Sequence, residues 1–257
     1  MFARFQISIE IVEKVLENRY LLLEDSSVSS EIEVTNMLMK LFSPVNGIIS
    51  GDALKKDFFP TETKRKFKVF ICHSHRDVDT VKKFANFLKD HFLIDCFVDS
   101  MAWKNIDTLQ RGLDAELMKN GKICYSDVLR SSAHVHAMLS LALYEMIDNC
   151  ECCIFVGSEN SLCLNLKQIQ TETLSPWIYQ EIFYMNHTKL NMPSWLDDST
   201  QYVANESYAP IRTYSDISHG IDLSEFRQLG LSDFSVLKRG DEFLRYIYWQ
   251  HNFTRLK

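Results

Sequence analysis

The chain has 257 residues, of which 46% are hydrophobic and 24% charged, and its formal net charge is -6 at pH 7. This length and hydrophobicity are typical of one well-buried domain with an appendage, and they exclude an intrinsically disordered chain. The acidic balance gives no electrostatic footprint for nucleic acid. No apolar run approaches the roughly 18 residues that a membrane-spanning helix needs. We therefore expect neither a nucleic-acid partner nor a membrane partner.

The seven cysteines favour buried, reduced thiols over a disulfide framework or a zinc site. Cys152 and Cys153 are adjacent, and Cys72 and Cys96 lie inside apolar runs. The first residues, Met1–Arg4, lack the apolar core and the cleavage site of a signal peptide. Together these features predict a cytoplasmic protein.

Residues 1–64 are expected to form an N-terminal helical extension, and residues 65–257 the main domain. Ile9, Val12 and Leu16 recur at the spacing of an amphipathic helix. A polar joint over 60–63 separates this region from a chain of different character.

The main domain is expected to alternate strands and helices. A continuous apolar run over 67–72 predicts a strand of a parallel sheet covered on both faces. Ser74 can cap the helix that follows, with Asp77 at its third position, and Ser175 with Pro176 begins another helix. The remaining strands are predicted over 94–98, 152–156 and 209–213, and the helices over 108–119, 133–147, 177–186 and 241–253. This order predicts an α/β fold with a doubly wound parallel sheet.

The segment Lys68–Asp77 also contains His-x-His-x-Asp, a pattern of metal hydrolases. The metallo-β-lactamase pattern continues with a histidine, whereas this chain has Val78. His134 and His136 offer a second pair, but residues two apart on a helix point away from each other. We therefore predict no metal site, and the plainer interpretation of the first pair is that it lines the end of a strand.

Three features together resemble the Toll/interleukin-1 receptor (TIR) domain, in particular its bacterial branch. They are the segment Lys68–Asp77, the strand and loop Cys96–Ser100, and Trp177 and Glu181 spaced four apart. In TIR domains the first strand ends in a Ser-containing turn, the second runs into the BB loop, and a Trp-x-x-x-Glu motif opens a later helix. The resemblance covers about residues 66–190 and implies a flavodoxin-like sheet. Ile178 replaces the Cys that commonly follows the Trp, and the insertion between Gly121 and Asn149 looks like that of the TIR subunit of Thoeris-type antiphage systems.

The resemblance implies cleavage of NAD+ at the nicotinamide–ribose bond, giving nicotinamide and ADP-ribose or a cyclic or conjugated ADP-ribose signal. NAD+ is then the substrate, and no further cofactor is expected. Because nicotinamide leaves from a cationic pyridinium, no general acid is needed. One carboxylate can then stabilise the oxocarbenium-like transition state. Glu181 is the candidate for that carboxylate.

Six further residues are candidates for binding the dinucleotide. His73 and Ser74 lie where a helix N-terminus favours a pyrophosphate. Trp177 lies one turn before the candidate glutamate, where it can contact the ribose or the nicotinamide. The others belong to the BB-type loop, which can gate the site, contact the dinucleotide or mediate self-association: Asp99, Ser100 and Trp103.

Two other functions stay open. The same fold serves as a non-catalytic interaction module that assembles through its BB loop. Nucleotide-processing transferases have a related topology, although no second catalytic carboxylate is evident here. The TIR resemblance also implies self-association and, for a signal-producing enzyme, a downstream effector that senses the product.

Overall fold

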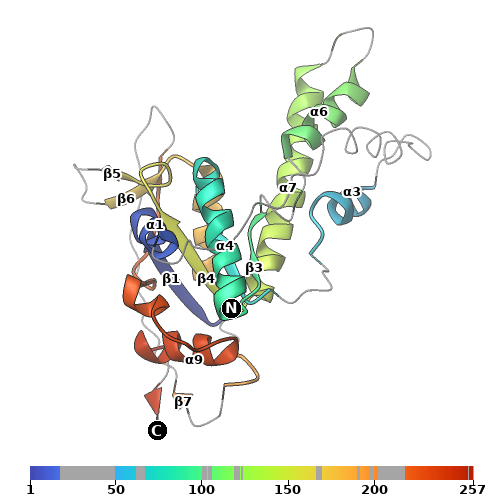
Figure 1. The fold of residues 1–257 in the computed structure, drawn as a ribbon. Helices are drawn as coiled ribbons and strands as arrows, with labels where there is room; N and C mark the ends of the chain where they lie inside the picture. The colour runs from blue at the N-terminus through green and yellow to red at the C-terminus, as the bar shows by residue number, and fades with distance from the viewer. Residues whose placement is uncertain are drawn as a thin grey trace. The chain divides into compact units, whose positions relative to one another are not determined.

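The computed structural model describes residues 1–17, 50–61, 67–99, 103, 106–118, 122, 124–165, 170–189, 192–196, 200–201, 218–253 and 255–256. The chain divides into two compact units (Figure 1). The first, which we call the sheet unit, combines residues 1–21, 64–101 and 146–257. The second, the helical unit, combines residues 22–63 and 102–145.

The sheet unit is built on a parallel sheet of five strands in the order β3-β2-β4-β1-β9. Every neighbouring pair runs parallel. The expected α/β class with a parallel sheet is therefore confirmed. The strands are β1 (Ala3–Ser8), β2 (Val69–Cys72), β3 (Cys96–Phe97), β4 (Cys152–Gly157) and β9 (Arg227–Gln228).

Residues 3–8 correct the expectation of a helical extension over residues 1–64. They form β1, which pairs with β4 from Ala3 opposite Cys152 to Ser8 opposite Gly157, and with β9 on its other side. The helical periodicity that begins at Ile9 is confirmed as α1 (Ile9–Glu17). The sheet unit thus begins with the first residues of the chain and not at residue 65. Residues 18–49 of the expected extension lie outside the described residues.

Helices cover both faces of the sheet. On one face α1, α4 (Val78–Phe92) and α9 (Asp241–Gln250) share a continuous hydrophobic core with alternate residues of the strands. Figure 1 shows α1 and α4 lying against the sheet. On the other face α8 (Pro176–His187) contacts β2. Its buried residues are Ile178, Glu181, Ile182 and Met185.

The chain leaves β2 and β4 toward opposite edges of the sheet. β2 leads through α4 to β3, and β4 leads through α8 to β9. Because β2 and β4 are neighbours, their carboxyl ends lie at a topological switch point, where parallel α/β sheets usually bind ligands. The order of the strands therefore directs attention to the residues that follow β2 and β4.

One predicted helix start agrees with the structure, and two differ. The Ser175 hydroxyl accepts from the Ile178 amide at 3.3 Å and begins α8. Ser74 accepts from the Arg76 amide at 3.4 Å, but it first caps the short 3-10 helix η1 (His75–Asp77), after which α4 begins. The helix expected over 133–147 begins earlier, as α7 (Tyr125–Asn149). Ser131, which precedes the expected range and would have been its natural cap, lies inside α7 and donates to the Val128 carbonyl.

The remaining elements are short. The helical unit contains α3 (Gly51–Phe58), α6 (Ile106–Leu117) and most of α7. β5 (Cys163–Asn165), β6 (Gln170–Thr173) and β8 (His219–Gly220) form an antiparallel sheet, and β7 (Thr200–Gln201) pairs with β10 (Arg255–Leu256). η2 (Leu231–Phe234) precedes α9. The strand predicted over 209–213 lies outside the described residues, and no described helix is long and apolar enough to cross a membrane.

Candidate functional site

Helix α8 places the side chain of Glu181 against the sheet. The buried positions of this helix follow the spacing i, i+3, i+4 and i+7, and Glu181 is the second of them. The residue is only 5% exposed. The carboxyl group of Glu181 therefore lies on the buried face of α8, where the other three positions are apolar.

Cys72 and Asp99 are the groups that act on this carboxyl. Cys72, the last residue of β2, donates its thiol hydrogen to Glu181. Asp99 follows β3 and adds a negative charge that acts on Glu181 and Cys72. Burial, and then the charge of Asp99, raise the pKa of Glu181 well above its ordinary value, and the thiol hydrogen bond offsets this only in part. Glu181 therefore holds its proton more tightly than an exposed glutamate does.

His73 follows Cys72 and has an unused hydrogen-bonding atom. The residue is 9% exposed, and its Nε2 is buried without a hydrogen-bond partner. The other ring nitrogen donates to the Ile71 carbonyl, so Nε2 carries a free lone pair. Burial lowers the pKa of His73 against the opposing charge of Asp99, and the ring is neutral at pH 7.

Arg4 is a buried cation on β1, but it is committed to the end of α8. Its Nε donates to the Met185 carbonyl at 2.7 Å, and its Nη2 donates to the Asn186 carbonyl at 3.5 Å. Carbonyls in the last turn of a helix have no partner within the helix. Arg4 therefore anchors the helix that carries Glu181 and does not neutralise its carboxyl.

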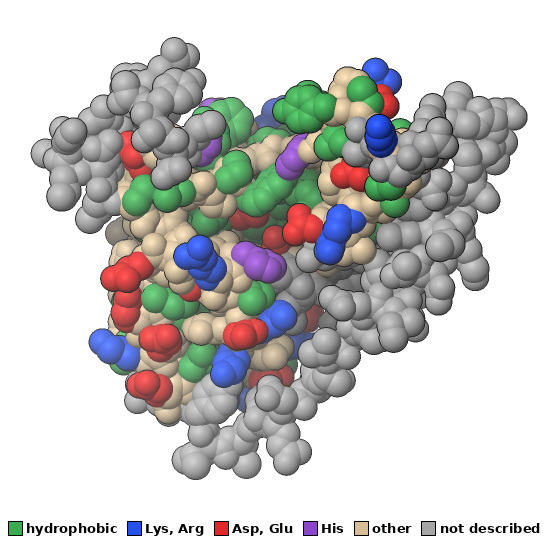
Figure 2. All heavy atoms as spheres, turned by 90° about the horizontal axis from the view of Figure 1, so that it is seen from above, with side chains coloured by type: hydrophobic (Ala, Val, Ile, Leu, Met, Phe, Trp, Pro, Cys, Tyr) green, Lys and Arg blue, Asp and Glu red, His purple; other side chains and the backbone are tan. Residues whose placement is uncertain are grey.

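A pocket of about 300 Å³ opens at the same edge of the sheet, between α1, the start of α4 and the turn after β4. Asp77 joins the segments that follow β2 and β4, because its carboxylate accepts hydrogen bonds from the Ser158 hydroxyl and from the Asn160 side-chain amide. The charged residues that line the pocket are Glu10, Glu13, Asp77, Asp79 and Glu159, with Arg76. Figure 2, the view from above, shows acidic and histidine side chains among hydrophobic ones. Carboxylates in this number repel a phosphate.

The structure brings together some of the residues predicted for the site. Glu181, His73 and Asp99 lie at the carboxyl ends of β2 and β3 or on the helix against them. Trp177 is half-buried one turn before Glu181. Ser74 is buried and serves as a cap.

The other predicted residues are not joined to this cluster by any described contact. Trp103 belongs to the helical unit, where its ring nitrogen donates to the Pro60 carbonyl at 3.3 Å and its ring lies edge-on to Phe59 at 5.6 Å between centroids. Ser100 lies outside the described residues. His134 and His136 are exposed on α7. Among the described residues, no group of three or more His, Cys, Asp or Glu is arranged to hold a metal ion.

Sequence reasoning missed Cys72 and Arg4 as residues of this region. Cys72 has a detectable signal, because it is the last residue of an apolar run and directly precedes two candidate residues. Arg4 has none, because its importance depends on β1 lying beside β4 and facing α8. All seven cysteines are free, but the expectation of buried thiols holds for only four of them: Cys124 is exposed, and Cys96 and Cys163 are half-buried.

Comparison of the chain with protein-family models, with curated proteins and with solved structures finds no match. The functional interpretation therefore depends on the residues of the site and on the resemblance that its motifs carry.

Proposed function

We propose that this chain is a TIR-type NAD+ nucleosidase that cleaves the nicotinamide–ribose bond. The observation that supports it most is Glu181, a carboxyl group 5% exposed and placed beside the carboxyl end of β2. Burying a carboxyl group costs free energy unless it gains something in return. In an α/β protein, a buried carboxyl at a switch point is a candidate for ligand binding or catalysis.

The reaction needs little from the protein beyond one negative charge. The bond between ribose C1′ and the pyridinium nitrogen breaks, and its electron pair stays on nicotinamide, which leaves as a neutral molecule. The ribose then carries the positive charge as an oxocarbenium-like species, which an adjacent Glu181 carboxylate stabilises. Attack by water gives ADP-ribose and a proton. Attack by a group of the same molecule gives a cyclic isomer, and attack by another acceptor gives a conjugate.

The neighbouring residues have roles consistent with this reaction. Trp177 has an aromatic ring one turn from Glu181. The unused lone pair on His73 Nε2 can accept a hydrogen bond from a hydroxyl group. The pyrophosphate site proposed at His73 and Ser74 stays a prediction, and the acidic pocket beyond them makes it electrostatically unfavourable. Self-association, a downstream effector, a cytoplasmic location and a role in antiphage defence belong to the same proposal.

The test is nicotinamide release from NAD+, measured at low and high protein concentration for the wild type, Glu181→Gln and Glu242→Gln. Glutamine keeps the shape of the protonated carboxyl and cannot ionise, so we expect release to fall by about 100- to 1000-fold. Glu242 is exposed at the start of α9, and its variant should match the wild type. Mass spectrometry of the products distinguishes linear, cyclic and conjugated ADP-ribose. Equal activity of Glu181→Gln and the wild type would refute the assignment of Glu181.

A non-catalytic interaction module is the second candidate, and exposed apolar residues on α7 favour it. Tyr125 is 75% exposed and Leu129 52%. They lie four residues apart, so their side chains are neighbours on the surface of the helix, and adjoining exposed apolar side chains favour a surface that binds another protein. If the wild type releases no nicotinamide at any concentration but associates in solution, and Leu129→Glu prevents that association, the interaction module becomes the better description.

A further inference from the structure

We infer that Arg4 is a positioning residue for the reaction: its guanidinium fixes the last turn of α8 to the sheet and thereby holds the carboxyl group of Glu181 at the end of β2. The inference rests on the proposed function. It adds to that function a residue on a distant strand that acts on Glu181 through the helix between them.

The strand β1 points the side chain of Arg4 toward α8. Phe5 and Ile7 belong to the core that α1, α4 and α9 share with the sheet. Because successive side chains alternate, Arg4 points to the opposite face, where it is 9% exposed. Its Nε donates to the Met185 carbonyl at 2.7 Å, and its Nη2 donates to the Asn186 carbonyl at 3.5 Å. A buried guanidinium loses its hydration, and these carbonyls replace the lost water.

The positions of Arg4 and Glu181 match along the strands and along the helix. The row of paired residues that contains Arg4 reaches β2 two residues before Cys72, a distance of about 6.6 Å along a strand. Glu181 lies four residues before Met185, and four residues of a helix rise about 6 Å. When Arg4 holds the Met185 carbonyl, Glu181 therefore reaches the level of Cys72, whose thiol donates to it.

The apolar contacts of α8 define this position less sharply than Arg4 does. The other buried residues of the helix are Ile178, Ile182 and Met185. Apolar contact is non-directional, whereas hydrogen bonds from a guanidinium are directional and charge-assisted. Carbonyls in the last turn of a helix are free to accept them. Because a displacement of about 1 Å can lower a rate about 100-fold, a directional contact one turn from Glu181 bears on the reaction itself.

The experiment compares Arg4→Lys with Arg245→Lys, a matched control. Lysine keeps the positive charge but lacks the fixed fork of donors. Arg245 is exposed on α9, which covers the opposite face of the sheet, and it also donates to a carbonyl, that of Trp195, at 2.9 Å. The control therefore loses the same kind of contact without disturbing α8.

The first measurement needs no substrate. It is the S–H stretching band of Cys72 in the infrared spectrum, which Cys72→Ala identifies by its loss and which a hydrogen bond moves to lower wavenumber. We expect a hydrogen-bonded thiol in the wild type and in Arg245→Lys. In Arg4→Lys the band should move toward that of a free thiol, because Glu181 no longer lies at the level of Cys72.

The second measurement is kcat and KM for nicotinamide release, per folded molecule. We expect Arg4→Lys to lower kcat at least tenfold and to leave KM within twofold, because the carboxyl group is displaced and not removed. Arg245→Lys should match the wild type in both constants. A change that only reduced stability would leave kcat per folded molecule unchanged.

The outcomes distinguish this inference from the proposed function. A free-thiol band in the wild type, an unchanged Cys72 band in Arg4→Lys, or a fall of kcat smaller than tenfold would overturn the inference. Nicotinamide release that Glu181→Gln abolishes would still uphold the nucleosidase in each of those cases. If the wild type releases no nicotinamide, the nucleosidase is refuted, and a band shift confined to Arg4→Lys would still show that Arg4 positions Glu181.

Discussion

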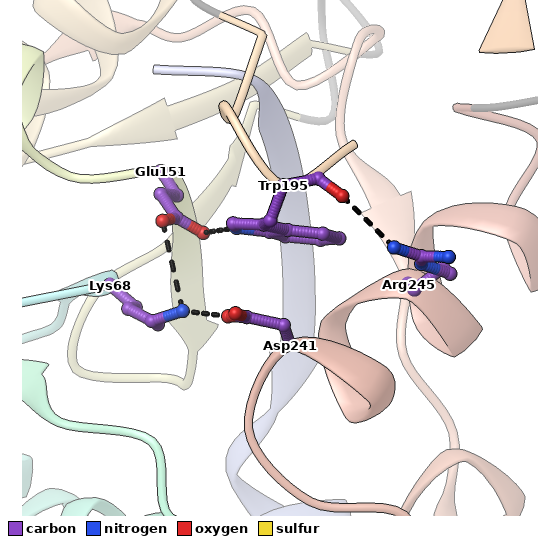
Figure 3. A network of polar contacts seen from close by, with 5 residues as sticks. All are labelled: Lys68, Glu151, Trp195, Asp241 and Arg245. Carbon is purple, nitrogen blue, oxygen red and sulfur yellow. Dashed lines mark hydrogen bonds and ion pairs between the residues drawn. The ribbon is translucent and has the colours of Figure 1, made fainter. Parts of the chain in front are cut away.

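The polar groups at the two ends of the parallel sheet differ in whether they have hydrogen-bond and ion-pair partners. At the amino ends of the strands, Lys68 lies between the carboxylates of Glu151, at 3.8 Å, and Asp241 (Figure 3). The Trp195 indole donates to Glu151 at 3.0 Å, and Arg245 donates to the Trp195 carbonyl at 2.9 Å. Donors and acceptors are matched, and each cation has a partner.

At the carboxyl ends of the strands, buried polar groups lack such partners. Glu181 is buried beside a thiol and near the charge of Asp99, and His73 Nε2 has no partner. Networks whose members satisfy one another hold a fold together, whereas groups buried without partners cost stability and persist where they are used. We therefore propose that one end of the sheet serves stability and the other serves chemistry, and variants at four residues can test that division.

The largest expected effect on stability is that of Arg4→Met. This substitution removes charged hydrogen bonds to the last carbonyls of α8 and leaves those carbonyls buried without a donor. We expect the free energy of unfolding, measured in urea, to fall by about 2–3 kcal/mol. Arg4→Lys keeps the positive charge but cannot donate to two carbonyls in the same geometry, so its free energy of unfolding should lie between those of the wild type and Arg4→Met. A variant Arg4→Met as stable as the wild type would mean that Arg4 does not anchor the end of α8.

The next effect is that of Lys68→Met, which leaves Glu151 and Asp241 without their shared cation. The lysine also lies 5.7 Å from the centroid of the Trp195 ring, so a cation–π contact is lost. Because these side chains are a quarter or more exposed, we expect a loss of about 1–2 kcal/mol and not more. Lys89→Met, on the exposed side of α4, is the control.

The activity of Lys68→Met sharpens the comparison. If the amino-end network serves only stability, nicotinamide release per folded molecule should equal that of the wild type. A change of tenfold or more in the folded protein would show that the two ends of the sheet are coupled.

The sequence predicts this division of labour only in part. The strands at β2 and β4 and the start of α8 were predictable, because continuous apolar runs and a Ser-Pro cap are local signals. β1 was not, although Phe5 and Ile7 alternate with Arg4 and Gln6 as in a strand. The helical periodicity after it masked this signal in so short a segment.

The site shows the same limit. Glu181 lies in phase with Ile178, Ile182 and Met185, so its position on the buried face of α8 is readable from the sequence. The thiol of Cys72 beside it, and the orphaned nitrogen of His73, depend on which strand α8 covers. That information arises only when distant segments pack together.

A smaller effect with the opposite sign is expected for Glu181→Gln. The folded-state pKa of Glu181 is raised by burial, so above the unfolded value of 4.5 the folded protein retains a proton that the unfolded chain has lost. This costs stability increasingly as the pH rises. We expect Glu181→Gln to be more stable than the wild type at pH 7, and the difference to shrink as the pH falls and to vanish near pH 4. A variant less stable than the wild type at pH 7 would mean that the carboxylate has a partner within the fold.

The smallest effect concerns His73, whose pKa burial lowers from the ordinary value of 6.5. The unfolded chain takes up a proton below that pH and the folded chain does not, so this residue costs stability as the pH falls through 6.5. The cost between pH 7 and pH 5.5 is at most about 1.3 kcal/mol. His73→Gln should remove this cost.

The difference between His73→Gln and the wild type, taken from urea unfolding at several pH values, isolates the contribution of the buried ring. If the variant follows the wild-type curve, the pKa of His73 is the same in the folded and the unfolded chain, and burial does not hold the ring neutral. A pH dependence that is lost in His73→Gln shows that burial keeps the ring neutral in the fold, so that Nε2 keeps the lone pair with which it can accept a hydrogen bond.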